Sequence, residues 1–189
     1  MRLVLMRHGE SVWNAENRFT GHTDIDLSAV GVEQARAAAR ELRRRGFAPD
    51  RVFTSHLRRA IRTAWIVLEE LDRMWVPLES HAGLNERCFG EFEGKTKAEV
   101  TERWGAESLR SFKNDWAWRP PGERGESLQD LRARVRPIWA ERIEPAVLRG
   151  ERVLVAIHGN TLRAMDDVVR PCGRDPVEAE IPPARPYFY

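Results

Sequence analysis

The sequence predicts an α/β fold: a three-layer sandwich with a mostly parallel central sheet, helices on both faces and a lid-like insertion. Short apolar segments alternate with longer segments of helical periodicity. The chain has 189 residues, 42% of them apolar, which is typical of one soluble domain with a sizeable core. Two apolar segments end in the same dipeptide, His-Gly. We therefore expect a single domain over residues 1–189, with the insertion at about 84–126.

The first half of the chain predicts strands that alternate with helices. Its first apolar run lacks polar alternation, which is typical of a strand buried on both faces. Ser28 is a typical helix N-cap, and Gly46 is a typical residue for a helix end. The predicted strands lie at 3–6, 51–55 and 75–78, and the predicted helices lie at 28–45 and 57–72.

The second half begins with an irregular stretch, which we interpret as the insertion. Its pattern breaks into short pieces that include a helix at 96–104 and an aromatic loop, rich in proline and glycine, at 116–125. Ser127 then begins a long amphipathic helix. This helix precedes a predicted strand at 153–157 and a predicted helix at 162–170.

The charge balance excludes two classes of partner. The 31 Lys and Arg residues against 29 Asp and Glu residues give a net charge of +2. That charge is too small for the field of a nucleic-acid binder or a polybasic membrane protein. We find no N-terminal leader, and no apolar run approaches the ~18 residues that span a bilayer. We therefore expect a cytoplasmic protein that binds neither nucleic acid nor membrane.

The spacing of cysteine and histidine argues against a metal site. Cys88 and Cys172 form no C-x-x-C motif, and the five histidines form no H-E-x-x-H motif. The sequence therefore predicts neither a zinc site nor a disulfide framework, as is usual in a reducing compartment.

Chemically active side chains follow the predicted strands. His8 follows the strand at 3–6, and His158 follows the strand at 153–157. In an open parallel sheet, functional sites lie beyond the carboxyl ends of the strands, and neighbouring strand ends are about 5 Å apart. If these two strands adjoin, both histidines reach one pocket. Arg7 would add a planar fork of donors that suits phosphate oxygens.

Two further side chains belong to the same predicted pocket. Arg59 opens the helix after the second strand, where free N–H groups and the helix dipole favour an anion. We interpret its neighbour Arg58 as part of a solvated helix turn. Glu86 alone would be a surface carboxylate, but beyond a strand end it can serve as a proton donor in the pocket.

Several motifs resemble those of a known family. Segment 5–11, Leu-Met-Arg-His-Gly-Glu-Ser, carries the Arg-His-Gly signature of the histidine phosphatase superfamily, and the resemblance covers nearly the whole chain. Further segments are similar to its 2,3-bisphosphoglycerate-dependent phosphoglycerate mutases. They are Trp13-Asn14, Glu16-Asn17-Arg18-Phe19-Thr20-Gly21, Phe53-Thr54-Ser55, Arg59-Ala60-Ile61-Arg62-Thr63, Leu84-Asn85-Glu86-Arg87 and His158-Gly159-Asn160-Thr161-Leu162-Arg163.

The resemblance implies phosphohistidine chemistry. His8 would be the nucleophile, and Glu86 would be the general acid and base. Arg7, Arg59 and His158 would hold the phosphoryl oxygens and offset their charge. The implied cofactor is 2,3-bisphosphoglycerate, acting as a phosphoryl primer, with no metal.

The resemblance also implies two groups of substrate-binding residues. Those near the phosphate would be Ser11, Asn14, Thr20, Gly21, Gly159 and Asn160. Those of an outer shell, which would contact the substrate's carboxylate and second phosphate, would be Arg87, Phe89, Lys97, Lys113 and Asn114. The mutase pattern has a tyrosine at position 89 and two arginines at 113–114. This chain therefore loses a hydroxyl contact and two bidentate forks in the outer shell.

Three functions remain open at this point. The one we favour is a phosphoglycerate mutase that interconverts 3-phosphoglycerate and 2-phosphoglycerate in glycolysis and gluconeogenesis. The alternative is a phosphatase, in which water accepts the phosphoryl group; the outer-shell departures favour it. A non-catalytic phosphate-binding relative is disfavoured because the expected catalytic side chains are all present. We also expect a small phosphorylated substrate and a homodimer formed through an exposed edge strand such as 75–78.

Overall fold

The computed structural model of the chain describes residues 2–170 and 181–189. It contains a five-stranded sheet in the order β3-β2-β4-β1-β5. The strands are β1 (Leu3–Arg7), β2 (Arg51–Thr54), β3 (Leu78–Ser80), β4 (Val153–Ile157) and β5 (Pro186–Phe188). The first four pair in parallel, whereas β5 is antiparallel to β1. The predicted α/β fold class with a mostly parallel sheet is therefore confirmed.

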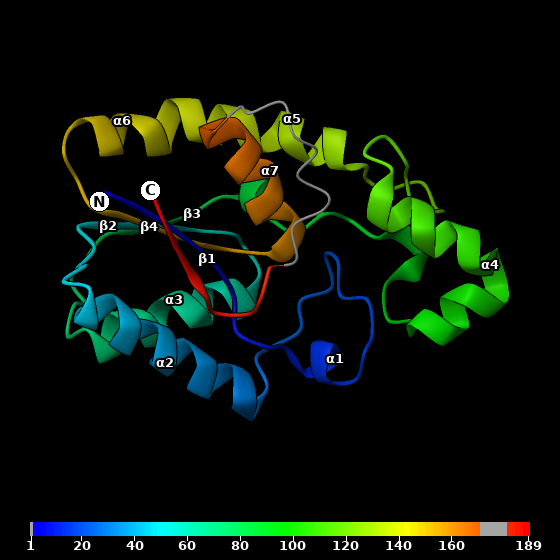
Figure 1. Cartoon of the computed structure of the whole chain (residues 1–189), viewed down its shortest axis with the longest axis horizontal. Coiled ribbons are helices and arrows are strands. Elements are labelled where there is room, and N and C mark those ends of the chain that lie inside the picture. The colour runs from blue at the N-terminus through cyan, green and yellow to red at the C-terminus, as the bar shows by residue number, and fades with distance from the viewer. Residues whose placement is uncertain (1, 171–180) are drawn as a thin grey trace.

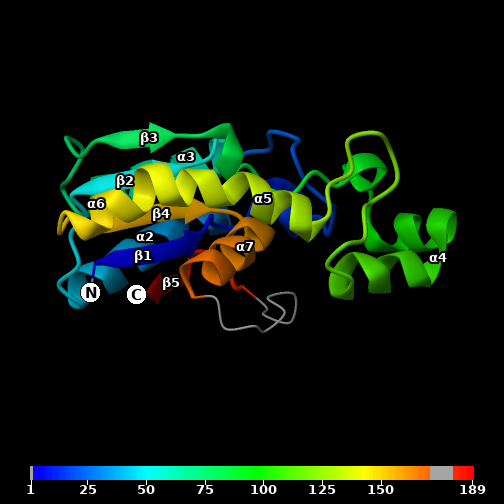
Figure 2. The same cartoon turned by 90° about the horizontal axis from the view of Figure 1, so that it is seen from above.

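Helices cover both faces of the sheet (Figure 1). They are α1 (Val12–Ala15), α2 (Ala29–Arg44), α3 (Arg58–Glu70), α4 (Lys97–Asn114), α5 (Leu128–Ile138), α6 (Glu144–Leu148) and α7 (Gly159–Val169). In both views, α2 and α3 lie on one face and α5, α6 and α7 on the other (Figures 1 and 2). A π-helical turn, Trp139–Ile143, joins α5 to α6. The result is the predicted three-layer sandwich.

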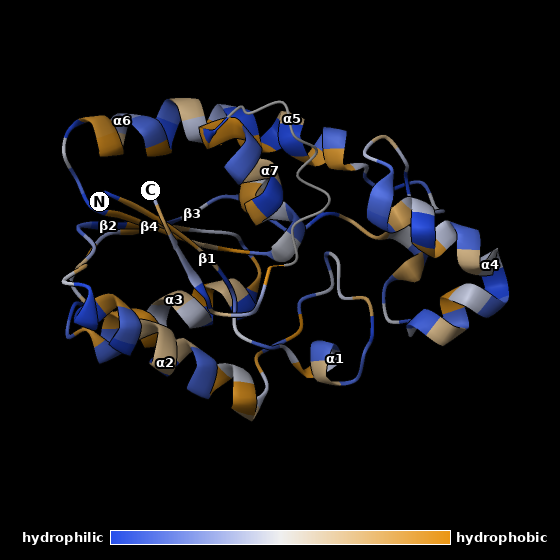
Figure 3. Cartoon of the chain, in the orientation of Figure 1, coloured by the Kyte–Doolittle hydropathy of each residue, from blue (hydrophilic) through white to orange (hydrophobic). Residues whose placement is uncertain are grey.

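Alternation along the central strands produces two apolar cores. Leu3 and Leu5 of β1 pack with apolar residues of α5, α6 and α7. Val4 and Met6 of the same strand pack with apolar residues of α2 and α3. Because successive side chains of a strand point to opposite faces, a fully apolar strand is buried on both. The apolar strands between more polar helices are visible in Figure 3.

Side-chain caps fix the starts of the predicted helices. The Ser28 hydroxyl accepts a hydrogen bond from Gly31 N at the start of α2, and the Ser127 hydroxyl accepts one from Asp130 N at the start of α5. Each bond satisfies a backbone N–H that has no partner within its helix. Both N-cap residues are those expected from the sequence pattern.

Three predicted elements were wrong in their extent. The helix expected at 162–170 is α7, which begins three residues earlier, at Gly159. The strand expected at 75–78 lies at Leu78–Ser80, because a turn occupies the residues before it and leaves the side chain of Trp75 exposed. The helix expected at 96–104 runs on as α4 to Asn114, across a kink at Gly105, where φ is 80°. Glycine adopts this positive φ easily, so the chain bends there and then resumes a helix.

Strand β5 was not predicted. Its sequence neighbourhood contains several prolines, which argue against a central strand because proline donates no backbone hydrogen bond. At the edge of the sheet this loss is tolerated, and Pro186 pairs opposite Met6 of β1. The other edge strand is β3, so the expectation of a dimer through that region remains a prediction.

The insertion follows the 3-10 turn Ala82–Leu84 and ends where α5 begins. It contains a second 3-10 turn, Gly90–Phe92, and α4. Its apolar side chains form a separate cluster centred on Phe89, Phe92 and Val100. In Figure 2, α4 stands away from the sheet at one end of the molecule. The insertion therefore has a small core of its own.

Two sequence expectations concern membranes and cysteines. Among the described residues, none of the helices combines the length and the apolarity that a bilayer span requires. Cys88 is buried and forms no disulfide. Cys172 lies outside the described residues.

Candidate active site

Two histidines meet at the carboxyl ends of β1 and β4. These strands are neighbours, and their register places Arg7 opposite Ile157, directly before His8 and His158. The backbone N–H of His8 donates to Ile157 O (2.8 Å). Both side chains are buried, and their ring centroids are 5.0 Å apart. The convergence that the two His-Gly dipeptides predicted is therefore present.

The ring of His8 is held in one tautomer. Its Nδ1 lies 2.5 Å from Gly9 O. Because a carbonyl oxygen accepts only, Nδ1 carries the proton and Nε2 keeps its lone pair. Burial, together with the charges of Arg59 and Arg7, holds the pKa of His8 well below its ordinary value. The ring is therefore neutral at pH 7, and Nε2 is available as a nucleophile.

Arg59 lies against this nucleophile. It occupies the first turn of α3 and is almost fully buried. Its Nε lies 3.3 Å from His8 Nε2, while its two terminal nitrogens donate to Gly21 O (2.7 Å) and Thr23 O (2.9 Å). Burial lowers the pKa of Arg59 to about 10, so the guanidinium remains charged at pH 7. It therefore places a fixed positive charge where an attacked phosphoryl group would lie.

The ring of His158 is held by Ser55, which follows β2. The Ser55 hydroxyl oxygen accepts from Leu57 N (3.1 Å) and lies 2.7 Å from His158 Nε2. Nδ1 is buried and has no hydrogen-bond partner among the described residues. Burial and the charge of Arg59 hold the pKa of His158 well below its ordinary value.

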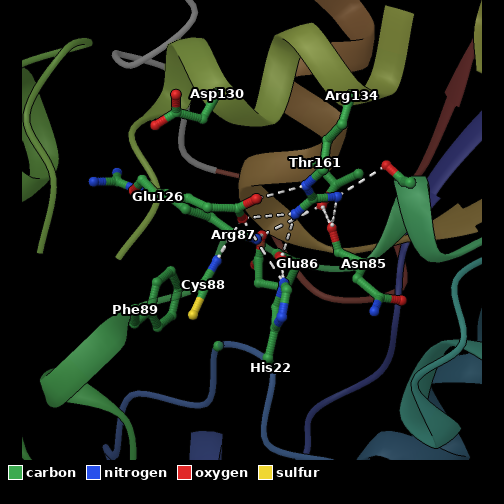
Figure 4. A network of polar contacts seen from close by, with 12 residues as sticks. His22, Asn85, Glu86, Arg87, Cys88, Phe89, Glu126, Asp130, Arg134 and Thr161 are labelled. Carbon is green, nitrogen blue, oxygen red and sulfur yellow. Dashed lines mark hydrogen bonds and ion pairs between the residues drawn. The ribbon is translucent and has the colours of Figure 1, made fainter. Parts of the chain in front are cut away.

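The carboxyl group of Glu86 reaches the same place from the insertion side. Its Oε1 accepts from Arg87 N (2.9 Å) and from Thr161 Oγ1 (3.4 Å), and its Oε2 accepts from Asn160 N (3.5 Å). Figure 4 shows Glu86 at the centre of this network, beside Asn85 and Thr161. Backbone and α7 contacts thus hold this carboxyl group at the pocket.

A cavity of about 360 Å³ opens between the sheet ends and the insertion. Helix α7 begins at this cavity, so its N-terminal N–H groups favour an anion there. The lining includes most of the predicted site residues: Arg7, His8, Asn14, Thr20, Gly21, Arg59, Glu86, Phe89, Lys97, Lys113, Gly159 and Asn160. It also includes six that were not singled out: Asn17, Arg18, Phe19, Phe112, Arg163 and Ile181.

A family model described as the histidine phosphatase superfamily, branch 1, matches residues 3–168 of the chain. The protein belongs to the histidine phosphatase superfamily. It is therefore an enzyme of phosphoryl-transfer chemistry, as the paired histidines, Arg59 and Glu86 indicate.

Solved structures of this superfamily resemble the chain closely. A mycobacterial glucosyl-3-phosphoglycerate phosphatase, solved with VO3, is 30% identical with a TM-score of 0.83, covering 98% of this chain and 88% of that one. An α-ribazole phosphatase from Shigella flexneri is 30% identical with a TM-score of 0.69, covering 88% of this chain and 78% of that one. Both names describe phosphatases.

Some residues predicted for the site lie elsewhere. The guanidinium of Arg87 donates to the carbonyls of Phe112, Trp118 and Glu126 at 2.6–3.2 Å, and does not line the cavity. Burial lowers the pKa of Arg87 to about 10. Asn114 also lies outside the lining, and Ser11 is a buried cap of α1. His158 is fully buried beside His8 and is not among the residues that line the cavity.

The lining residues that were not singled out lie next to recognised motifs. Asn17, Arg18 and Phe19 directly precede Thr20, and Arg163 lies one helical turn beyond Asn160 on α7. Helical spacing alone could have indicated Arg163, since residues three apart share a face. Phe112 and Ile181 gave no such signal, because distant segments of the chain bring them to the cavity.

Proposed function

We propose that the protein is a phosphohistidine-dependent phosphatase that hydrolyses small phosphomonoesters. The observation that carries the proposal is the position of Arg87, whose guanidinium is bound to three carbonyls and lies outside the cavity lining. A mutase must hold a second phosphate and a carboxylate, and the sequence had assigned Arg87 to that task. The names of the two solved relatives also favour the phosphatase over the mutase that we first preferred.

The first step is attack by His8 on the phosphorus atom. Nε2 forms the P–N bond while the bond to the leaving oxygen breaks, and the carboxyl group of Glu86 donates a proton to that oxygen. The charges of Arg7 and Arg59 offset the negative charge on the equatorial oxygens.

The second step hydrolyses the phosphohistidine. The Glu86 carboxylate accepts a proton from water, whose oxygen attacks phosphorus as the P–N bond breaks. Inorganic phosphate leaves, and His8 returns to its neutral form. Because Nδ1 of His8 stays bonded to Gly9 O, the ring keeps its orientation through both steps.

The outer wall of the cavity indicates what the leaving group contains. Lys97 and Lys113, at the two ends of α4, line it together with the rings of Phe19, Phe89 and Phe112. Two ammonium groups suit a second negative charge, and the phenyl rings suit an apolar surface. The substrate class is therefore a small organic phosphate with an additional anionic group.

The test is a metal-free assay with EDTA that follows two products of 3-phosphoglycerate. Free phosphate and the 2-phosphoglycerate isomer are measured with and without 2,3-bisphosphoglycerate, and phosphate release from other small phosphomonoesters is scored in parallel. We expect free phosphate from monoesters, little isomer and no stimulation by the bisphosphate. Isomer formation that depends on the bisphosphate would instead establish the mutase. The His8→Ala variant should lose all turnover, and large residual activity would contradict the mechanism.

A further inference from the structure

The general acid lies on a segment without regular secondary structure. Glu86 follows the 3-10 turn Ala82–Leu84 and precedes the turn Gly90–Phe92. A proton-transfer group must lie within hydrogen-bond reach of the leaving oxygen, so a free loop would place it poorly. Some other part of the molecule must therefore fix this segment.

Arg134 of α5 makes three hydrogen bonds to this segment. One terminal nitrogen donates to Gly83 O (2.9 Å) and Asn85 O (2.8 Å), and the other donates to Glu86 O (2.7 Å). Figure 4 shows Arg134 reaching from α5 to the backbone around Glu86. One guanidinium thus holds three carbonyls within four residues, including that of the general acid itself.

Glu126 holds this guanidinium in place. Its carboxylate accepts from Arg134 Nε (2.8 Å) and from a terminal nitrogen (2.9 Å), a bidentate pair. It also accepts from Cys88 N (2.8 Å), two residues beyond Glu86. Burial alone would raise the pKa of Glu126, but the hydrogen bonds and charge of Arg134 hold it below its ordinary value. The carboxylate is therefore charged at pH 7.

The opposite side of the segment is fixed by His22. Its Nε2 donates to Glu86 O (2.6 Å), the same oxygen that Arg134 contacts. Neither Arg134 nor Glu126 is among the residues that line the cavity. Both therefore act on the site through the backbone of Glu86, and not by touching a bound phosphate.

We propose that Arg134, held by Glu126, is a positioning residue that places the carboxyl group of Glu86 for proton transfer to the leaving oxygen. The inference rests on the proposed phosphatase activity. The effect of Arg134 on the rate should therefore be larger for a leaving group that needs protonation by Glu86 than for one that does not. An ester with a stable leaving anion departs without much protonation, whereas a poor leaving group depends on the acid.

The experiment compares Arg134→Met with the wild-type enzyme on two aryl esters of similar shape. For p-nitrophenyl phosphate, the good leaving group, kcat/KM should fall less than about threefold. For phenyl phosphate, the poor one, it should fall on the order of 10²-fold, because general acid catalysis contributes 10²–10⁴-fold. Glu86→Gln should show the same selectivity. Competitive inhibition by inorganic phosphate should change less than about twofold, since Arg134 lies outside the cavity lining.

Arg132→Met is the matched control. Arg132 lies two residues away on α5 and pairs with Asp167 (2.6 Å) instead of the Glu86 segment. Both esters should react with this variant as with the wild type. Circular dichroism and melting temperature establish that each variant is folded. If Arg134→Met unfolds, Glu126→Gln, which keeps an acceptor for Cys88 N, gives the same comparison.

Two results would overturn the positioning role. Equal slowing of both esters would show a general structural effect, and no slowing of either would show that Glu86 needs no support from α5. A wild-type enzyme that releases phosphate from neither ester would instead refute the proposed function, and this inference with it. The two failures are therefore distinguishable.

Discussion

At the scale of single residues, the pocket keeps His8, the proposed nucleophile, neutral beside fixed positive charges. Burial and neighbouring arginines lower the pKa of His8 and of His158, while Arg59, with a pKa of about 10, stays charged. A histidine exposed to water would titrate near pH 6.5 and lose its lone pair below it. Burial thus lowers the pKa of both groups: Arg59 remains charged at pH 7, whereas His8 remains neutral and keeps its lone pair.

The planar fork of Arg59 should matter as much as its charge. Lysine retains the positive charge but cannot contact His8, Gly21 O and Thr23 O at once. We expect Arg59→Lys to lower kcat for monoester hydrolysis on the order of 10²-fold, the effect of losing one oriented donor. Steady-state phosphate release at pH 7 measures it. A loss below about tenfold would mean that charge alone suffices.

The two buried histidines should make the protein less stable in mild acid. In the unfolded chain they bind protons below about pH 6.5, whereas in the folded chain their pKa values are lower. The unfolded state therefore holds more protons, and the free energy of unfolding falls as the pH drops below 6.5. The loss reaches about 1.4 kcal/mol per pH unit for each histidine until the folded-state pKa is reached.

Denaturant unfolding at several pH values between 7 and 5 measures this loss. His8→Asn is the informative variant, because asparagine keeps a donor for Gly9 O but does not titrate. For this variant, the free energy of unfolding should fall less steeply with decreasing pH than for the wild type, by up to about 1.4 kcal/mol per pH unit, the contribution of one histidine. An unchanged slope would show that His8 does not bind protons differently in the two states.

Site residues were predictable from the sequence where a regular element fixes the direction of the side chain. His8 and His158 directly follow two adjoining buried strands, so the strand pattern was enough to bring them together. Arg87 follows Glu86 in an irregular loop, and its direction depends on carbonyls from residues 112–126. No sequence pattern reports the conformation of such a loop.

At the scale of secondary-structure elements, the first turn of α2 packs against the loop that carries His8, the proposed nucleophile. A Cβ atom on Gly31 would lie 2.0 Å from Glu10 O, and one on Gly9 would lie 2.2 Å from Gly31 O. Ser28 N also donates to Glu10 O (2.9 Å). The first turn of α2 thus fixes the backbone just after His8.

Gly31→Ala tests this contact. In an open helix, replacing glycine with alanine stabilises by about 1 kcal/mol. Here the clash with backbone should dominate, and we expect a loss of about 1–3 kcal/mol together with lower activity as the His8 loop shifts. Denaturant unfolding and phosphate release measure the two effects.

Val30→Ala is the neighbouring control, since Val30 is exposed on the same turn. It should change the free energy of unfolding by less than about 0.5 kcal/mol. If Gly31→Ala were as stable as this control, the backbone at Glu10 would be able to move away from the added methyl group with no loss of free energy of unfolding.

Elements were predictable where both periodicity and end signals were present. The helices capped by Ser28 and Ser127 began where expected, and β4 has the predicted bounds. The short edge strands β3 and β5 have little apolar pattern, and their positions depend on pairing with β2 and β1. The helix expected at 96–104 has its predicted N-terminal region, but the second helical stretch of α4 beyond the kink at Gly105 was not predicted.

At the scale of the whole molecule, the cavity of the proposed active site lies where the sheet and the insertion meet. Phe19, from the segment between β1 and α2, contacts Phe89 (5.8 Å between ring centroids) and Phe112 (5.3 Å) of the insertion. This aromatic cluster joins the two parts and also lines the cavity. The fold class was predictable from the sequence, but this aromatic junction depends on contacts between distant segments.

Because the insertion supplies part of the cavity wall, we expect its residues to determine which substrate is preferred. Lys113 lies in the last turn of α4 and lines the cavity, whereas its neighbour Asn114 does not. We expect Lys113→Arg, which adds a bidentate fork, to lower KM for 3-phosphoglycerate about fivefold relative to phenyl phosphate, or about 1 kcal/mol. Asn114→Arg should leave that ratio within about twofold. Steady-state kinetics on both esters measures the ratio, and an equal effect of the two substitutions would mean that general charge, rather than the cavity wall, selects the substrate.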